Sequence, residues 1–176
     1  MSTVPAILMS EEDFLALPES TQRQELLDGE VVVSPSPSMT HQRIVLRLAS
    51  WLLRWADEHS PAFVGLSPLD VRLGRQRIVQ PDLFVLLHGA SGQTPIDAVP
   101  DLVIEVLSHN RSYDRLAKRF VYEQAGVREY WMVDPERRCI EVVLNGAHRE
   151  ERAHAISGVL ADFSVDVHAL FSELTA

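Results

Sequence analysis

The chain has 176 residues, of which 46% are hydrophobic and 23% charged, and this predicts one globular domain rather than a disordered, collagen-like or coiled-coil protein. The formal net charge of −9 argues against a histone-like polyanion binder, because neutralising several phosphates needs a local excess of cations, so any such surface must be a local patch. A single cysteine, no apolar stretch of membrane-spanning length and no targeting signal at the amino terminus predict a soluble cytoplasmic protein without an internal disulfide.

The first forty residues predict a short helix followed by a hairpin. A capping box at residues 10–13 begins the helix. Residues 24–33 have the hairpin pattern, in which the Asp28-Gly29 pair suits a two-residue turn that needs positive φ. One face of this hairpin is shared by Glu25, Leu27, Glu30 and Val32. We treat residues 1–40 as an amino-terminal extension of the single domain at residues 1–176.

The predicted catalytic core at residues 41–135 alternates helices with apolar strands. In chain order we expect a helix at residues 41–58, strands at 63–73, 78–87 and 101–107, a helix at 112–125 and a strand at 129–133. The strands at 78–87 and 101–107 are almost continuously apolar, which is typical of strands buried on both faces of a sheet. Residues 136–176 predict an edge hairpin around Asn145-Gly146 and a tail with a short helix. The order predicts an α/β fold with a central mixed β-sheet flanked by helices.

Two acids interrupt the apolar strands. Asp82 follows Pro81 in one run, and Glu105 lies in the middle of the next. A buried carboxylate without a partner is costly, so two of them on neighbouring strands need a metal ion or a cationic side chain between them. The alternative for either acid is a position at the protein surface, which suits Asp82 at a strand start better than Glu105.

Lys118 is the only lysine among sixteen basic residues. It lies four residues after Asp114 in the second predicted helix, and a surface salt bridge between the two is the simplest explanation. A chain that uses arginine everywhere else could have used it for such a pair as well. The choice of lysine therefore favours a role that needs a compact ammonium group with a tunable pKa.

The order and spacing of several motifs resemble the Uma-two family in the PD-(D/E)XK restriction-endonuclease-like superfamily. The resemblance extends from about Glu11 to Phe171. The residues that carry it are Glu25 to Glu30, His41, Pro81-Asp82, Glu105-Val106-Leu107-Ser108, Asp114, Lys118, Tyr122, Gly126-Val127 and Glu129 to Asp134.

The resemblance implies a restriction-endonuclease-like core and a metal-dependent endonuclease that hydrolyses phosphodiester bonds, with DNA as the expected partner. Asp82 and Glu105 would hold Mg²⁺ or Mn²⁺, together with the Val106 carbonyl. The superfamily pattern Glu-X-Lys would place lysine at position 107, where this chain has Leu107. The resemblance therefore passes this role to Lys118, which would orient or help deprotonate the attacking water and offset charge on phosphorus.

Glu30 and His41 complete the candidate catalytic residues. Glu30 would add an outer carboxylate, and His41 would contact phosphate or assist the leaving group. A solvated hairpin acid and a helix-start residue bonded to loop backbone are the respective alternatives. Nucleic-acid backbone contacts are expected from Arg43, Arg47, Arg111 and Arg115.

Two other functions remain open. A nuclease-like module that binds nucleic acid or protein without catalysis would fit the acidic charge balance. A hydrolase of a small phosphate ester would keep the site and change only the substrate, and a cleft without a basic groove would favour it. Exposed strand edges favour self-association, for which a homodimer is the commonest symmetric outcome.

Overall fold

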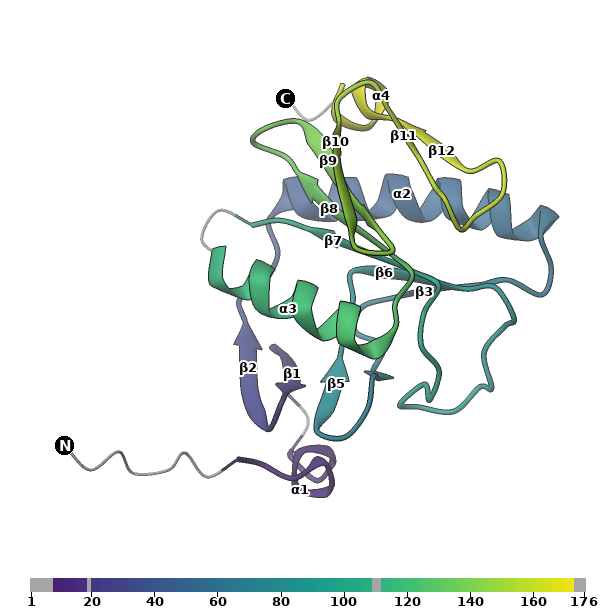
Figure 1. The fold of residues 1–176 in the computed structure, drawn as a ribbon. Helices are drawn as coiled ribbons and strands as arrows, with labels where there is room; N and C mark the ends of the chain where they lie inside the picture. The colour runs from purple at the N-terminus through teal and green to yellow at the C-terminus, as the bar shows by residue number, and fades with distance from the viewer. Residues whose placement is uncertain (1–7, 19, 109–111, 173–176) are drawn as a thin grey trace.

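A computed structural model describes residues 8–18, 20–108 and 112–172 (Figure 1). Its central sheet has the strand order β10-β9-β8-β7-β6-β3 and consists of β3 (Phe63–Leu66), β6 (Leu83–Leu86), β7 (Leu102–Val106), β8 (Glu129–Asp134), β9 (Cys139–Leu144) and β10 (Ala147–Glu151). β7 and β8 are parallel and are joined through α3 (Ser112–Ala125), whereas the other neighbours are antiparallel. The predicted α/β fold with a central mixed sheet is confirmed.

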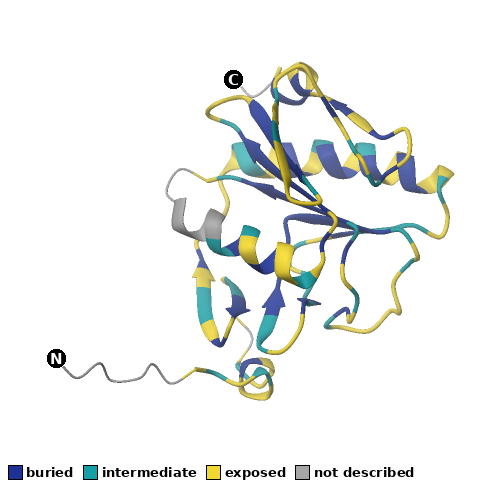
Figure 2. Ribbon diagram, viewed as in Figure 1, coloured by how far each residue is buried: buried dark blue, intermediate teal, exposed yellow. Residues whose placement is uncertain are grey.

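Helices cover both faces of this sheet, and its central strands β6, β7 and β8 are buried between them (Figure 2). α2 (Met39–Glu58) packs on one face, where its apolar side chains share a core with Ile104 and Val106 of β7. α3 packs on the other face, where Tyr122 shares a second core with Val103 of β7. Because side chains alternate along a strand, Glu105 points to the α3 side.

A second, four-stranded antiparallel sheet lies on the α3 side of the molecule (Figure 1). It has the order β2-β1-β5-β4 and consists of β1 (Arg23–Leu27), β2 (Glu30–Ser34), β4 (Val71–Arg72) and β5 (Arg77–Val79). The predicted hairpin is confirmed as β1 and β2, and its turn residues Asp28 and Gly29 both have positive φ, 51° and 88°. Because β1 also pairs with β5, the amino-terminal hairpin is joined directly to the rest of the domain.

The predicted extent of two strands was wrong. The run at residues 63–73 divides into β3 and β4, and the run at 78–87 divides into β5 and β6, with one strand of each pair in each sheet. Pro81 cannot donate a hydrogen bond to a strand ladder, so the second run breaks beside it. The chain crosses between the sheets at residues 80–82, and Asp82 therefore precedes β6 instead of lying within it.

The remaining elements close the ends of the fold. α1 (Glu11–Leu15) is capped by the Ser10 side chain as predicted, and the β9-β10 hairpin lies at the edge of the central sheet. α3 has the predicted bounds and ends at Gly126, where φ is 87° and the next amide, Val127 N, donates to the Tyr122 carbonyl. The tail contains α4 (Val167–Phe171) and an unpredicted pair, β11 (His154–Ile156) and β12 (Ser164–Asp166). None of the described helices is long and apolar enough to cross a membrane.

Candidate functional site

Residues from both sheets and from α2 line a cleft of about 700 Å³. The acids predicted from the sequence, Asp82 and Glu105, both line it, and so do Lys118 and His41. Most of the other polar side chains that line it are hydroxyls and amides, namely Ser20, Thr21, Gln22, Ser34, Ser36, Ser38, Thr40, Gln42, Ser67, Gln80 and Ser108. In the part of the lining that the structure describes, the cleft is thus strongly charged only where the predicted residues meet.

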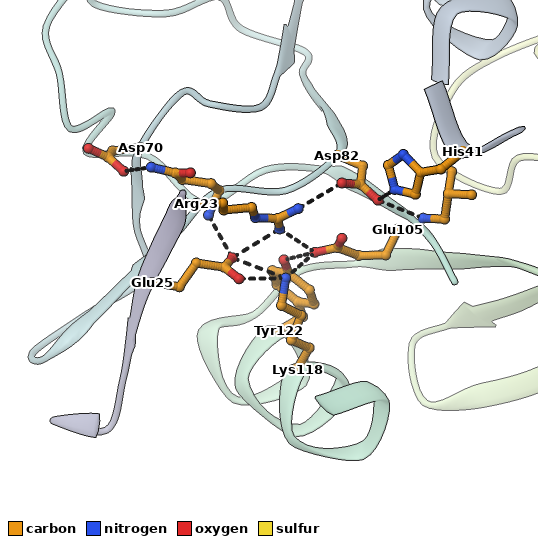
Figure 3. A network of polar contacts seen from close by, with 10 residues as sticks. Arg23, Glu25, His41, Asp70, Asp82, Glu105, Lys118 and Tyr122 are labelled. Carbon is orange, nitrogen blue, oxygen red and sulfur yellow. Dashed lines mark hydrogen bonds and ion pairs between the residues drawn. The ribbon is translucent and has the colours of Figure 1, made fainter. Parts of the chain in front are cut away.

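Asp82 is buried and fully engaged where the chain crosses between the sheets (Figure 3). Its Oδ2 accepts a hydrogen bond from Val106 N at 2.8 Å and lies 3.0 Å from His41 Nε2, while its Oδ1 accepts from Arg23 Nη1 at 2.7 Å. Burial would raise the pKa of Asp82, but the hydrogen bond with His41 and the charge of Arg23 outweigh it, so the pKa is lowered. Asp82 is therefore a buried, ionised acid.

Glu105 faces the same cluster from β7. Three donors converge on its Oε1, namely Tyr122 OH at 2.7 Å, Lys118 Nζ at 3.0 Å and the more distant Arg23 Nη2 at 3.5 Å. Burial raises the pKa of Glu105, and the negative charges of Asp82 and Glu25 add to this effect against the opposing cations. The crowding on one oxygen holds the carboxylate in a fixed orientation.

Lys118 is buried and its ammonium lies among carboxylates. It is therefore not the surface residue that the simplest explanation, a surface salt bridge, requires. Its Nζ is 3.0 Å from Glu105 Oε1 and 2.8 Å from Glu25 Oε2. Lys118 and Tyr122 are one turn apart on α3 and both reach Glu105. Burial lowers the pKa of Lys118, but Glu105 and Glu25 outweigh it and the pKa is raised, so the group stays an ammonium.

Two residues at the centre of the cluster, Arg23 and Glu25, were not predicted as site residues. Both come from β1; the Arg23 side chain reaches Asp82 and Glu105, and the Glu25 side chain reaches Lys118 (Figure 3). Arg23 Nη2 lies 3.1 Å from Glu25 Oε1, which also accepts a hydrogen bond from Gln80 N at 2.8 Å. Burial would raise the pKa of Glu25, but the charges of Lys118 and Arg23 outweigh it and lower the pKa.

A signal for Glu25 was present in the sequence. The hairpin register places it on the same face as the apolar Leu27, and both residues are buried in the structure. Arg23, two residues earlier on the same strand, points to the same side as Glu25 because side chains alternate. This alternation indicates that Arg23 and Glu25 share a face, but it does not show that this face meets Asp82 and Glu105.

Two carboxylates of this cluster, those of Asp82 and Glu105, have the ligand chemistry that a hard divalent cation takes. The Arg23 guanidinium bridges Asp82 and Glu105, so both carboxylates face one positive group. Carboxylate oxygens are the ligands that Mg²⁺ and Mn²⁺ prefer. No three acidic, His or Cys side chains among the described residues are arranged to hold a metal ion together. Two carboxylates nevertheless suit Mg²⁺, which usually keeps several waters and completes its shell with substrate phosphate.

The other predicted residues lie in different places. Glu30 is exposed at the turn end of β2 and does not line the cleft, so the structure does not bring it to the acids. Arg47 donates to the Ala169 and Leu170 carbonyls and so joins α2 to α4. Arg43 is exposed on α2, whereas Arg111 and the side chain of Arg115 lie outside the described residues.

Glu129 shows that a buried acid in an apolar strand can also be structural. It is fully buried at the start of β8 on the central sheet. Trp131 Nε1 donates to it at 2.8 Å, Ser157 Oγ at 2.6 Å and Val159 N at 3.1 Å. These neutral donors satisfy the carboxylate and fasten the loop at residues 157–159 to the sheet.

Comparisons with known proteins show the family and the fold of the chain. A family model described as "Uma2: Putative restriction endonuclease" matches residues 11–166. The fold is similar to a crystal structure described as "a putative nuclease belonging to DUF820" from Anabaena variabilis, with a TM-score of 0.82 and 21% sequence identity over 95% of this chain and 99% of that chain. At this identity the likeness establishes the fold. A search of curated proteins found no match.

Proposed function

Because the chain belongs to the Uma2 putative restriction endonuclease family, we propose that it is a divalent-metal-dependent endonuclease that cleaves phosphodiester bonds in DNA. One observation carries the proposal. The carboxylates of Asp82 and Glu105, 23 residues apart in the sequence, converge on one cation in a cleft, with the Lys118 ammonium 3.0 Å from Glu105. Two acids beside a lysine are the groups that metal-assisted phosphodiester hydrolysis needs.

Each residue of the cluster has a distinct part in the proposed reaction. Bound at Asp82 and Glu105, Mg²⁺ or Mn²⁺ would polarise the phosphate and lower the pKa of a bound water. His41 and the Val106 amide hold the Asp82 carboxylate in its orientation. The Lys118 ammonium positions the attacking water by donating to it and offsets the charge that builds on phosphorus. Its raised pKa favours this role over proton abstraction.

Removal of the metal gives the first test. Purified full-length protein is expected to nick supercoiled plasmid DNA in the presence of Mg²⁺ or Mn²⁺, to lose this activity in excess chelator and to regain it when the metal is restored. The measurement is the initial rate of conversion of supercoiled to open-circular DNA. Cleavage that continues in chelator would contradict metal dependence, and binding of DNA without cleavage in either metal would support the non-catalytic module instead.

The lining of the cleft favours one other substrate class, a small phosphate ester. Among the described residues, the basic side chains that line it, Arg23, His41 and Lys118, each already contact an acid, and the remaining polar side chains of the lining are hydroxyls and amides apart from the acids themselves. Hydrolysis of bis(p-nitrophenyl) phosphate without any cleavage of plasmid DNA or of single-stranded oligonucleotides would favour this reading. The reverse pattern would favour the endonuclease.

Glu25 is a positioning residue in this proposal, because it holds the Lys118 ammonium with both carboxylate oxygens at 2.8 and 3.0 Å. The Glu25→Gln variant is expected to cleave about tenfold more slowly at saturating metal, since a small displacement of an aligned group is costly. Glu25→Asp, which keeps the charge, is expected to retain more of the rate. Equal rates for both variants and the wild type at saturating metal would show that Glu25 does not position Lys118.

A further inference from the structure

The Arg23 guanidinium occupies the space between the two predicted metal ligands. One nitrogen, Nη1, lies 2.7 Å from Asp82 Oδ1, and the other, Nη2, lies 3.5 Å from Glu105 Oε1 and 3.1 Å from Glu25 Oε1 (Figure 3). A cation that bridges Asp82 and Glu105 therefore meets a position at which the chain already supplies a positive charge.

We propose that Arg23 is the resident cation of the metal-free site, and that it competes with the divalent ion for Asp82 and Glu105 and is displaced when the ion binds. This inference rests on the proposed function, because it assigns the same two acids to the metal. It adds that the affinity of the site for metal is set by a residue outside the ligand set. Without the ion, the guanidinium prevents two buried carboxylates from repelling each other.

The surroundings of the Arg23 guanidinium allow it to move away from Asp82 and Glu105. Its Nε is buried and has no hydrogen-bond partner among the described residues, so the group is incompletely satisfied in this position. Arg23 lines the cleft, and 17% of its side chain is exposed. It is the first residue of β1 and follows the exposed residues Thr21 and Gln22, which also line the cleft. A rotation of the side chain into the cleft thus requires no break in the β1-β5 pairing, which involves Leu26 and Leu27.

The charges predict the direction of the effect. Three carboxylates, Glu25, Asp82 and Glu105, face two cations, Arg23 and Lys118, so the cluster carries a net charge of −1 apart from His41. Replacing Arg23 by an uncharged residue changes this to −2 and removes the competitor. Both changes favour a divalent cation, and the effect is large because the groups are shielded from solvent.

Calorimetric titration of the full-length protein with Mn²⁺ tests this competition. Arg23→Met, which keeps an unbranched side chain and loses the guanidinium and its charge, is expected to bind Mn²⁺ about tenfold or more tightly than the wild type. The matched control is Arg128→Met. Arg128 pairs with Asp101, which directly precedes β7 at the end of the strand away from Glu105. The affinity of this control for Mn²⁺ is expected to equal that of the wild type. The Arg23→Met variant is also expected to gain more thermal stability from Mn²⁺ than the wild type does.

The outcomes separate this inference from the proposed function. Mn²⁺ binding that Arg23→Met leaves unchanged or weakens would overturn the role of Arg23 while leaving a metal-dependent enzyme in place. No binding by either protein would overturn both. Should Arg23→Met fail to fold, the wild type still decides the question: with ¹⁵N-labelled arginine, the Arg23 guanidinium signal is expected to lose its ion-paired shift on addition of Mg²⁺. A signal that stays constant while Mg²⁺ binds would contradict displacement.

Discussion

Replacing either Asp82 with Asn or Glu105 with Gln is expected to lower the rate of metal-dependent DNA cleavage by about a thousandfold or more. Each change keeps the size of the side chain and removes one of the two negative charges that would hold the ion. The loss is largest for Asp82, because its Oδ2 also binds Val106 N and His41 while its Oδ1 binds Arg23. The rates are compared on supercoiled plasmid at a fixed metal concentration.

Glu58→Gln is the matched control for these two variants. Glu58 is an exposed acid at the end of α2, so its loss changes the net charge by the same amount outside the cleft. We expect this control to cleave at the wild-type rate. If Asp82→Asn and Glu105→Gln also cleave at that rate while remaining folded by circular dichroism, the two acids do not hold a catalytic ion. If all four proteins bind DNA equally and none cleaves it, the chain is a binding module.

Replacing Lys118 with Met is expected to give the second largest effect, a fall of about a hundredfold in cleavage rate at saturating metal. The substitution removes the ammonium that lies 3.0 Å from Glu105 and that would position the water and stabilise the transition state. Lys118→Arg is expected to restore little, because a planar guanidinium does not fit the buried position of a compact ammonium between Glu25 and Glu105.

The Lys118 variants need a control for stability. Replacing Lys118 removes the ammonium that contacts both Glu25 and Glu105. Loss of one member of a buried ion pair lowers the free energy of unfolding by about 3 to 5 kcal/mol in comparable cases. Thermal unfolding therefore accompanies the rate measurement, and rates are taken below the transition. A folded Lys118→Met protein with the wild-type rate at saturating metal would remove Lys118 from the catalytic residues.

The candidate acids could be predicted from the sequence because each is a charge in an apolar run. This rule identifies Asp82 and Glu105, but it also applies to Glu129, whose role is structural. The sequence cannot separate the two cases, since the donors that satisfy Glu129 include Ser157 and Val159, which are 28 and 30 residues away. Only the partners of a buried carboxylate show whether it needs a cation.

Arg23 is the residue that sequence reasoning could least foresee. Its position over Asp82, 59 residues later in the chain, depends on how the β1-β5 pairing brings the second sheet to the central one. Periodicity describes each strand but not which sheet it joins. For the same reason the runs at residues 63–73 and 78–87 were predicted as single strands, although Pro81 marked the place where the second one breaks.

A crystal structure of the protein with Mn²⁺, with the ion located by its anomalous scattering, tests the central assignment most directly. The account predicts one peak with carboxylate oxygens of Asp82 and Glu105 about 2.0 to 2.3 Å from it, the Lys118 ammonium beside them and the Arg23 guanidinium moved away from both acids. A peak at any other site, or saturating Mn²⁺ with Arg23 still bridging Asp82 and Glu105, would contradict it.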